Sequence, residues 1–536
     1  MNRKIIFPRV SSNTIFILLF LSLTAVFLFL TLGSVILGHL SLTYDEPQHF
    51  KYGELIYNLQ SDRFDDSKMP VSVLNVIPSK VAEHFFGNSF SNQWQVMSIG
   101  RITTIFVSWL LAVLCFIWIK SLYGKWVGLI GFGLYVFEPN IIAHSQLITT
   151  DIYAAATVTL SLFAFWKFLE KPDLKRAVLA GLALGLCQIA KYSGILLYPI
   201  LILLIFLRYG GWVFVHIRQR GWRNLVRGIW IFIKYCIVFL ITSIVVINVG
   251  FLFNRTAMPL GNYQFKSSFF QSLQKINPLI DKMPIPLPYP YVEGLDFVMF
   301  RERTGDGYGN IYLLGQLRQG VGFPGYFLVA SLFKIPISIL ILFGVSLGAW
   351  LRSFRWNEFL KVDMFFVVPG LVYSIYFNFF FEAQIGIRFL LVIFPIMLIF
   401  ITRFFKNWSG FSKRLRILSG LAGIYLVVSV LSYFPFYLSY FNELVLDRTQ
   451  SYRILADSNI DWGQNKAELT EFLSQHPDYS FEPTVPTAGT VVVGVNELIG
   501  VVGKPEDFQW LRERFKPVGN FRYSYLIYNI SPSEIN

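Results

Sequence analysis

The sequence predicts a polytopic α-helical membrane protein with a small α/β domain at its C-terminal end. Of the 536 residues, 54% are hydrophobic and only 15% are charged, whereas soluble globular chains carry about 25% charged residues. Apolar runs recur along most of the chain at about 20 residues, the length that a membrane-spanning helix needs. This pattern ends near residue 440, beyond which charges, turns and short alternating segments follow.

The formal charge of +14 is distributed as membrane topology requires, with basic clusters between apolar runs at alternate turns. The loop 208–227 holds five Arg and no acidic residue, and such loops face the cytoplasm. We therefore expect a multi-pass plasma-membrane protein with a cytoplasmic N-terminus and no nucleic-acid partner. Cys115, Cys187 and Cys236 all fall in apolar runs, which disfavours disulfides and a cysteine metal site.

About eleven spans are expected, beginning with an uncleaved first one. The run 15–37 follows Arg3, Lys4 and Arg9 and is longer than the core of a signal peptide, which has about 7–15 residues. The other spans are expected at about 99–119, 126–142, 152–168, 177–207 (split at Lys191 into a hairpin of two), 229–252, 326–350, 364–381, 389–404 and 417–438. An odd number of crossings places the C-terminus outside.

This count divides the chain into a transmembrane domain, 1–439, with outer loops 39–97 and 254–323, and an extracytoplasmic α/β domain, 440–536. In the first outer loop we expect a helix over 45–59, then turns and extended segments at 68–70 and 74–78. In the C-terminal domain we expect helices at 464–475 and 505–515 and strands at 490–495 and 523–530.

Two adjacent carboxylates, Asp45 and Glu46, stand where the first span emerges into water, in Tyr44-Asp-Glu-Pro-Gln-His49. Ionisable groups are costly at a membrane and mark functional sites. Two like charges this close should raise the pKa of one of them, so that it could act as a general base near neutral pH. The alternative is structural, with Asp45 capping the helix that follows.

A second group of polar side chains, Glu138, His144 and Asp151, falls in a turn on the same side of the membrane. Asp151 begins the fourth span, so it is either a second functional carboxylate or a charge that stabilises the N-terminus of that helix. His144 is a candidate binding residue, with a structural role as the alternative for a single histidine.

Four basic residues are expected near these acids: Lys68 in the first outer loop, and Arg101, Lys191 and Arg388 at outer ends of spans. Each alone could extend its charge toward lipid head groups. Together they predict a site for an anionic lipid head group, because Arg makes bidentate contacts with phosphate and Lys supplies a point charge. A carboxylate beside that head group would activate an acceptor.

The polar stretch Asp457-Ser-Asn-Ile-Asp-Trp-Gly-Gln464 opens the C-terminal domain, and we interpret it as a strand that ends in a helix cap. The chain contains no P-loop and no HExxH motif. Neither an ATP site nor a site of the soluble metalloprotease type is therefore indicated.

These residues resemble the polyprenyl- and dolichyl-phosphate-dependent glycosyltransferases of the GT-C fold, in particular prokaryotic relatives of the protein O-mannosyltransferases in glycosyltransferase family 39. The blocks that carry the resemblance follow in family order over nearly the whole chain. They are 44–49, 139–151, 312–316, 334–336, 385–388, 437–443 and 457–464.

The resemblance implies an inverting transfer of a sugar, with mannose one candidate, from a polyprenyl-phosphate carrier to a protein, lipid or glycan acceptor at the outer membrane face. It implies that Asp45 is the catalytic base, and that Glu46 and Asp151 assist in binding acceptor and sugar. The implied ligands of the carrier are Lys68, Arg101 and Arg388, beside which we place His144 and Lys191 as further binding candidates. Some relatives use a divalent metal and others do not, and the sequence leaves both open.

Two other hypotheses compete with the enzyme. In a lipid-linked sugar transporter or flippase the same charges would line a path, but transporters often show matching, interrupted halves, and none is visible here. A scaffold that presents the C-terminal domain would make no use of the carboxylate pair.

Overall fold

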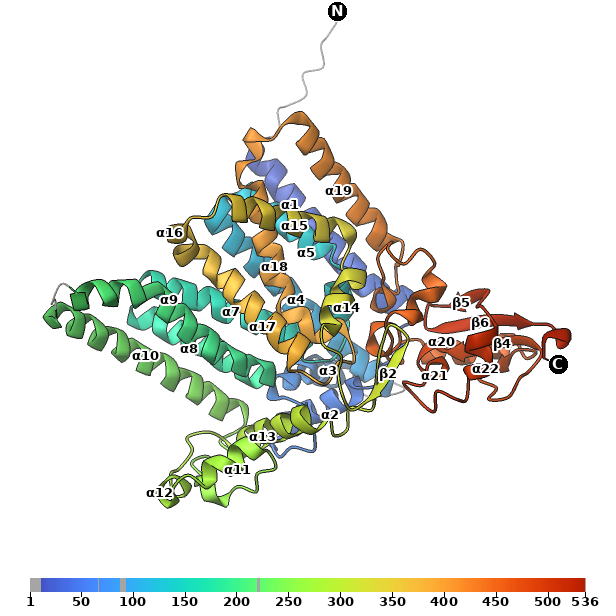
Figure 1. Ribbon diagram of the computed structural model, residues 1–536, viewed down its shortest axis with the longest axis horizontal. Helices are drawn as coiled ribbons and strands as arrows, with labels where there is room; N and C mark the ends of the chain where they lie inside the picture. The colour runs from blue at the N-terminus through green and yellow to red at the C-terminus, as the bar shows by residue number, and fades with distance from the viewer. Residues whose placement is uncertain (1–10, 66, 87–92, 219–221, 536) are drawn as a thin grey trace, which may run out of the picture.

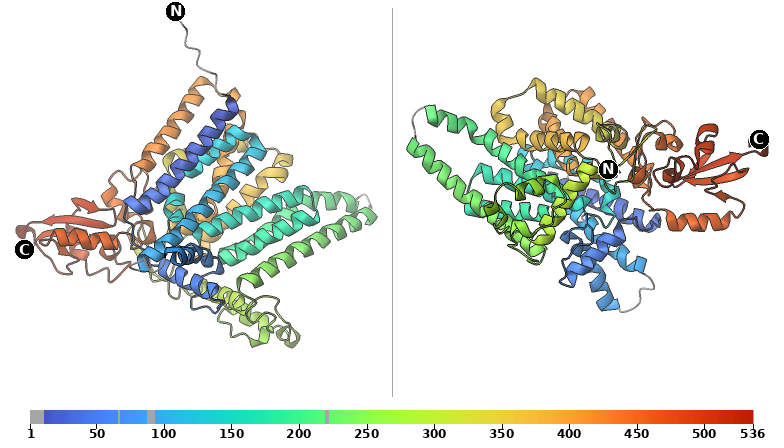
Figure 2. Two further views of the ribbon diagram at one scale, coloured as in Figure 1. Left: turned by 180° about the vertical axis from the view of Figure 1, so that it is seen from behind. Right: turned by 60° about the horizontal axis from the view of Figure 1, so that its bottom comes forward.

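The computed structural model describes residues 11–65, 67–86, 93–218 and 222–535, so Arg3, Lys4 and Arg9 lie outside the described residues. Long helices make up most of it and fan out toward the top and left of Figure 1, while the C-terminal sheet lies at the right. Figure 2 shows from other directions that this sheet projects to one side of the helical bundle. The predicted multi-pass helical class is confirmed: the described residues hold 7 helices long and apolar enough to cross a membrane, or up to 9 if each of two bent pairs is one span.

Some of the long apolar segments form one continuous helical span, and others are bent at a break. Those that qualify as single spans contain α1 (Ser12–Leu37), α4 (Gln93–Tyr123), α7 (Asp151–Glu170), η3 (Tyr192–Leu196) with α9 (Leu197–Arg218), α10 (Trp222–Gly250), α16 (Trp356–Glu358) with the π-helical turn η5 (Phe359–Asp363) and α17 (Met364–Phe379), and α19 (Lys413–Leu431). The bent pairs are α5 (Lys125–Val136) with α6 (Pro139–Ser145), at 66°, and α14 (Tyr326–Lys334) with α15 (Ile337–Arg352), at 116°. Pro139 and Pro336 stand at the two breaks, where proline interrupts the helical hydrogen bonding.

Two expected spans are helical but short. The helix α8 (Leu174–Ala190) has 17 residues, and the run 389–404 divides into the 3₁₀ helix η6 (Ile387–Val392) and α18 (Phe394–Thr402), followed by η7 (Arg403–Gly410). A typical span takes about 20 residues, with a range of about 17–25. The helix break expected at Lys191 is present, with φ −163° and ψ 144°, and the count of eleven stays a prediction.

Close packing of α8 against α10 holds this end of the bundle together. A Cβ atom on Gly185 would stand 2.5 Å from Cβ of Val246 and 2.9 Å from the carbonyl oxygen of Ser243. Gly181, one turn earlier, is equally crowded by Phe239 of the same partner helix. Because lipid tails are as apolar as leucine, membrane helices associate through such close contacts. The packing therefore places Lys191, at the end of α8.

The first outer loop is more helical than expected. It contains α2 (Glu46–Tyr57), η1 (Pro70–Ser72) and α3 (Val73–Phe86), so the helix expected at 45–59 is confirmed. The extended segment expected at 74–78 is wrong, because α3 continues through Pro78. Its buried face packs on α4, where Nδ2 of Asn75 donates to the Gly100 carbonyl and to Oγ1 of Thr104, each at 2.8 Å. These contacts stabilise the helix although proline disfavours a position inside a helix.

The second outer loop covers the same end of the bundle with short elements. They are η4 (Leu260–Asn262), α11 (Ser268–Gln274), α12 (Pro278–Asp281), α13 (Tyr289–Thr304) and the antiparallel hairpin of β1 (Asn310–Leu313) and β2 (Gln316–Gln319). In the 16-residue helix α13, Tyr291 and Val292 are buried in a cluster with Tyr192 and Phe251. This cluster ties the loop to the ends of α8 and α10.

The C-terminal region begins irregularly with η8 (Tyr437–Ser439), η9 (Arg448–Arg453) and η10 (Asp457–Asn459). It continues with α20 (Lys466–Gln475), β3 (Ser480–Phe481), β4 (Gly489–Gly494), α21 (Val495–Leu498), α22 (Gln509–Arg514), β5 (Gly519–Phe521), β6 (Tyr525–Ile530) and η11 (Pro532–Glu534). The sheet has the order β3-β4-β6-β5, parallel only between β3 and β4. The strand expected at 457–464 is wrong, because hydrogen bonds to distant segments shape that stretch into a 3₁₀ turn and a loop.

The sheet shares its core with the helical bundle. Side chains alternate between the two faces of a strand, and on β4 Val492 packs with Leu469 and Tyr525 on one face. Val491 and Val493 face the other way, into the hydrophobic cluster that also contains the membrane helices. The sheet is thus fixed against the bundle.

We predict that Gly185→Leu lowers the Tm of the detergent-solubilised protein, because the new side chain must separate α8 from α10. Overpacking of this kind costs about 1–3 kcal/mol. Gly344→Leu is the matched control, since nothing lies within 4 Å of its Cβ position. Equal Tm values for the two variants would contradict the close packing of these helices.

Candidate functional site

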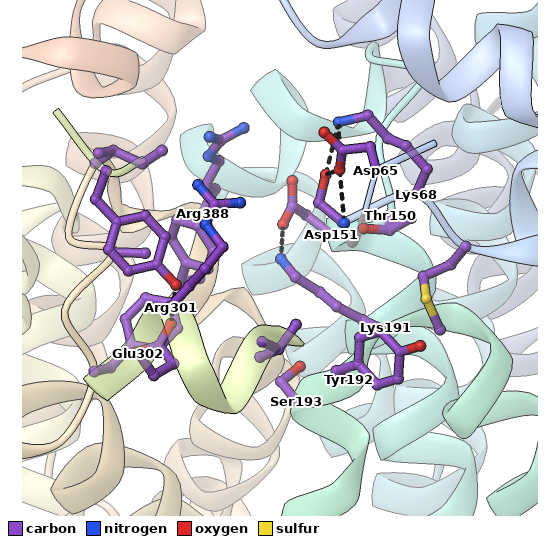
Figure 3. A pocket seen from close by; sticks show the side chains of 18 of the residues that line it. Asp65, Lys68, Thr150, Asp151, Lys191, Tyr192, Ser193, Arg301, Glu302 and Arg388 are labelled. Carbon is purple, nitrogen blue, oxygen red and sulfur yellow. Dashed lines mark hydrogen bonds and ion pairs between the residues drawn. The ribbon is translucent and has the colours of Figure 1, made fainter. Parts of the chain in front are cut away.

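A cavity of about 610 Å³ opens where the first outer loop, the start of α7, η3, α13 and η6 meet (Figure 3). Its charged lining comprises Asp45, Asp65, Lys68, Asp151, Lys191, Arg301, Glu302, Arg303 and Arg388. Its apolar lining includes Ile195, Leu196, Leu295, Val298, Met299, Phe377, Phe380, Phe381 and Phe389. The volume is typical of ligand sites, which span about 300–1,000 Å³, and the two kinds of wall suit a ligand with a charged head and an apolar tail.

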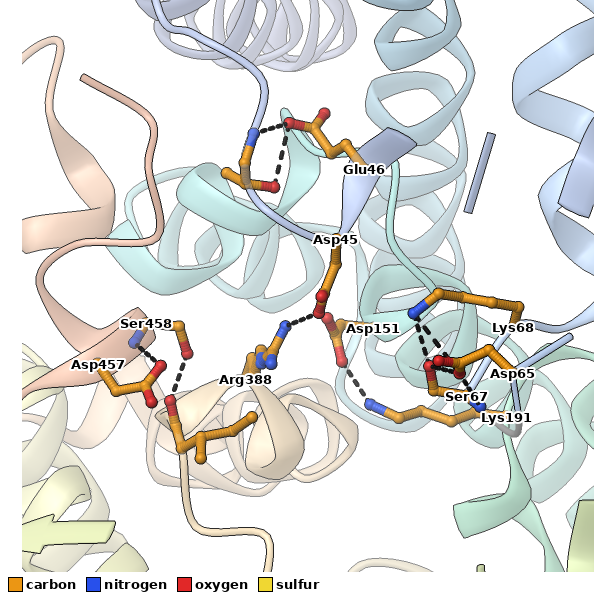
Figure 4. Close-up of polar contacts among 12 residues, drawn as sticks. Asp45, Glu46, Asp65, Ser67, Lys68, Asp151, Lys191, Arg388, Asp457 and Ser458 are labelled. Atoms are coloured by element: carbon orange, nitrogen blue, oxygen red, sulfur yellow. Dashed lines mark hydrogen bonds and ion pairs between the residues drawn. The ribbon is translucent and has the colours of Figure 1, made fainter. Parts of the chain in front are cut away.

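Asp45 points into this cavity and meets Arg388, whose Nη1 donates to Oδ2 of Asp45 at 3.1 Å (Figure 4). Asp45 stands at the N-cap position of α2 but makes no capping hydrogen bond, so the capping alternative is not realised. Burial raises the pKa of Asp45, yet the charges of Arg388 and Lys68 outweigh burial and lower it below its usual value. The sequence-based expectation of a raised pKa is wrong for Asp45, because cations face it.

Asp151 and Lys191 form a second ion pair at the centre of the cavity (Figure 3). Asp151 is the first residue of α7 and is nearly buried, whereas Lys191 lies in the break between α8 and η3. The Lys191 ammonium also lies 4.5 Å from the centre of the Phe389 ring. A helix start and a helix break thus bring opposite charges together across 40 residues of sequence.

Lys68 lies on the other side of Asp151 from Arg388 in the view of Figure 3. Its Nζ donates to Oγ of Ser67 at 2.7 Å and lies 3.7 Å from Oδ1 of Asp65. Burial raises the pKa of Asp65, but the Lys68 charge and the hydrogen bonds from Ser67 have a larger effect and bring this pKa below its usual value. Three of the basic residues that line the cavity, Lys68, Lys191 and Arg388, are thus each paired with one aspartate.

Glu46 points away from Asp45 (Figure 4) and meets Arg101, with Arg101 Nη2 to Glu46 Oε2 at 2.6 Å and Nε to Oε1 at 2.8 Å. Both side chains are buried, at 0% and 1% exposure, and neither is among the described residues that line the cavity. The backbone N–H groups of Thr43 and Ile148 donate to the same carboxylate at 2.7 and 2.9 Å. Arg101 also donates to the carbonyls of Leu40 and Ser41.

His144 also lies outside the cavity lining. It is buried on α6, and its ring centre lies 6.3 Å from that of Trp462. Of the eight site residues predicted from the sequence, the structure thus brings together Asp45, Lys68, Asp151, Lys191 and Arg388, and it sets Glu46, Arg101 and His144 behind them.

The structure adds side chains from α13 that the sequence interpretation missed. Glu302 lines the cavity and accepts a hydrogen bond from the Tyr308 hydroxyl at 2.6 Å and from the Glu382 backbone N–H at 2.9 Å. Burial raises its pKa to about 7. The signal in the sequence is Arg301-Glu-Arg303, a charged triplet in a loop otherwise rich in proline and aromatic residues.

The donor set does not fit a resident metal ion. Among the described residues, no group of three or more His, Cys, Asp or Glu side chains could hold one. The carboxylates Asp45 and Asp151 are each already engaged by a basic side chain.

The fold and the cavity define a multi-pass helical membrane protein with an amphipathic cavity at one end of its bundle. Residues 86–257 match the family described as dolichyl-phosphate-mannose-protein mannosyltransferase. This match includes Asp151 and Lys191, and it confirms the resemblance predicted from the sequence. No curated protein matches the chain.

Solved structures with a similar course of the chain include ArnT from Cupriavidus metallidurans bound to undecaprenyl phosphate, with a TM-score of 0.48 at 11% identity over 98% of this chain and 100% of that one. The Archaeoglobus fulgidus oligosaccharyltransferase tethered to an acceptor peptide has a TM-score of 0.48 at 12% identity over 98% of this chain and 75% of that one.

We predict that Arg101→Gln destabilises the protein by about 3–5 kcal/mol, because it leaves the buried Glu46 carboxylate without its charge partner. Lys167→Gln breaks an exposed pair with Glu170 and should cost at most about 1 kcal/mol. Thermal unfolding in detergent measures both. A loss for Arg101→Gln no larger than for Lys167→Gln would argue against a buried pair.

We predict that His49 makes the fold sensitive to acid. Burial and the Lys68 charge lower the pKa of His49 to about 3, whereas an unfolded histidine takes up a proton below about pH 6.5. The unfolded state then binds more protons, so stability falls as the pH drops from 6.5, by roughly 1 kcal/mol per unit.

The measurement is the Tm of wild type and of His49→Gln between pH 7 and pH 5. The wild type should lose more stability on acidification than the variant, whatever their difference at pH 7. His84→Gln, at an exposed position, should follow the wild type.

Proposed function

We propose that this protein is a membrane glycosyltransferase that moves a sugar from a polyprenyl-phosphate carrier to an acceptor hydroxyl, with Asp45 as general base. The observation that carries the proposal is the cavity in which Asp45 faces Arg388 and Lys68 beside an apolar wall. The family match over residues 86–257 supports the same class, and its description names a dolichyl-phosphate-mannose donor.

The carrier phosphate would lie among Arg388, Lys68 and Lys191. Arg388 is suited to this role because its Nε is buried and has no hydrogen-bond partner within the described part of the chain. A guanidinium offers paired N–H groups to phosphate oxygens, and fixed cations stabilise the charge that develops on a leaving phosphate. The carrier's apolar tail would follow the phenylalanines of α17 and η6 that line the same cavity.

Asp45 would take the proton from the acceptor hydroxyl. In the free protein its pKa is lowered by Arg388 and Lys68 after burial has raised it, so the group is ionised but a weak base. A phosphate bound to these cations offsets their charge, and a nearby anion raises the pKa of a carboxyl group. Donor binding thereby makes Asp45 a stronger base when the acceptor is to be deprotonated.

The transfer proceeds as a single displacement. Asp45 removes the acceptor proton, the acceptor oxygen forms a bond to the anomeric carbon, and the bond from that carbon to the phosphate oxygen breaks. The electron pair leaves with the carrier phosphate, and attack from the opposite face inverts the anomeric centre. Asp151 binds the sugar, with mannose as a candidate, while Glu46, Arg101 and His144 act as positioning residues.

We place this site at the outer face of the plasma membrane, with the C-terminal sheet on the same side and the N-terminus in the cytoplasm. Basic clusters at Arg352 and Arg355 and at Lys413, Arg414 and Arg416 support this orientation. Arg352 ends α15 and Arg355 directly precedes α16. Lys413, Arg414 and Arg416 begin α19, whose start lies at the top of Figure 1, away from the C-terminal sheet, and basic ends of spans face the cytoplasm. A protein, lipid or glycan hydroxyl would enter from outside.

We predict that Asp45→Asn lowers sugar transfer by about 10²–10⁴-fold, the usual contribution of a general base. The assay follows radiolabelled sugar from a set of polyprenyl-phosphate sugars to acceptors in a membrane extract, using the purified protein in liposomes. Asp62→Asn is the matched control, since this acid of the same loop is 79% exposed.

Transfer by Asp45→Asn at the rate of the control would reject Asp45 as the base. If the wild-type protein moves the lipid-linked sugar across the liposome membrane but transfers no sugar to an acceptor, the protein is a flippase and the proposed enzyme activity is rejected.

A further inference from the structure

The segment 457–464 lies beside Arg388, although it belongs to the C-terminal region, and Figure 4 shows Asp457 and Ser458 next to Arg388. The Trp462 ring stacks on the guanidinium group, with its centre 3.7 Å from the central carbon of Arg388. Both residues are buried, at 7% exposure each. The N–H groups of a guanidinium lie in its plane, so a ring against its face leaves the edge free for ligands. One edge nitrogen, Nη1, donates to Asp45, and Nε has no hydrogen-bond partner among the described residues.

The same segment holds the backbone that carries Arg388. Oδ1 of Asn459 accepts a hydrogen bond from the Ile387 backbone N–H at 3.0 Å, and the Ser458 hydroxyl donates to the Ile385 carbonyl. A Cβ atom on Gly386, between these contacts, would collide with the Ser458 hydroxyl. The turn before Arg388 is therefore built against 457–459.

Two further contacts join this segment to α14. Nζ of Lys334 donates to the carbonyl of Asn459 at 2.6 Å, and Nδ2 of Asn459 donates to the Tyr326 hydroxyl at 2.8 Å. Since all of these groups are buried, the bonds are shielded from water and hold the segment in place.

The segment also reaches the backbone that carries Asp45. The Tyr44 backbone N–H donates to the Trp462 carbonyl at 3.0 Å, and the Ser41 N–H donates to the Gln464 carbonyl at 2.8 Å. Nε2 of Gln464 donates to the Ile460 carbonyl at 2.9 Å, within the segment itself. Arg388 and Asp45, 343 residues apart, thus share one support.

We propose that Trp462 is a positioning residue that holds Arg388 edge-on to the carrier phosphate, so that the C-terminal region completes the phosphate site. This inference rests on the proposed function. A function for the C-terminal region follows from it: removing the support releases Arg388 without removing any group that touches the sugar or the acceptor.

The test is binding of a polyprenyl monophosphate, compared with the polyprenol that lacks the phosphate, to the full-length protein in lipid nanodiscs. For Trp462→Leu we expect the Kd of the monophosphate to rise about 3- to 30-fold, the range of a cation–π contact that is partly or fully shielded from water. The Kd of the polyprenol should not change, and Trp462→Tyr should restore most of the loss.

In the transfer assay, Trp462→Leu should raise the KM for the donor and leave the KM for the acceptor unchanged. Trp356→Leu, at an exposed tryptophan on α16, is the matched control. Ser458→Ala, which removes the bond to the Ile385 carbonyl, is a second and milder variant in case Trp462→Leu does not fold.

A monophosphate Kd that is unchanged in both variants, or an equal loss for monophosphate and polyprenol, would overturn the role of Trp462 while the proposed function stands. A wild-type protein that binds the monophosphate no better than the polyprenol would overturn both.

Discussion

The buried ion pair of Glu46 and Arg101 determines where the first outer loop leaves the membrane. A buried pair is stable only when its remaining hydrogen-bonding groups are also satisfied, and here the backbones of Leu40, Ser41, Thr43 and Ile148 supply those partners. The pair therefore joins the segment after α1, the start of α2, the N-terminal third of α4 and the turn before α7. Asp45 and Asp151, which follow directly on two of these segments, take their positions from it.

Two adjacent carboxylates thus have opposite surroundings. Successive residues at the start of a helix point about 100° apart, since a turn takes about 3.6 residues, so Glu46 turns into the protein when Asp45 faces the cavity. Glu46 forms its ion pair with Arg101, whereas Asp45 faces Arg388 and Lys68. In the proposed reaction the pairing of Asp45 can change, because a bound phosphate can replace Asp45 as the partner of Arg388 and Lys68. The buried pair of Glu46 and Arg101 stays as it is.

The cavity is assembled from segments that come from most of the chain. The first outer loop supplies Asp45 and Lys68, the helix start at α7 supplies Asp151, the break after α8 supplies Lys191, and η6 supplies Arg388. The sheet is not a separate appendage, since it shares its core with the bundle and the segment before it supports Arg388. A large hydrophobic bundle is rigid enough to hold such scattered charges in register.

The amino-acid sequence alone predicts the features that depend on residues close together in the chain. Apolar length predicts the spans. Charged residues at their outer ends and in the first outer loop predict a group that includes Asp45, Asp151, Lys68, Lys191 and Arg388, because ionisable groups are costly near lipid and mark functional sites. Which acidic side chain pairs with which basic side chain depends on the tertiary structure. Four features depend on contacts between residues far apart in the chain, and such contacts leave no local periodicity in the sequence. They are the opposite orientations of Asp45 and Glu46, the continuation of α3 through Pro78, the position of Glu302 in the cavity and the stacking of Trp462 on Arg388.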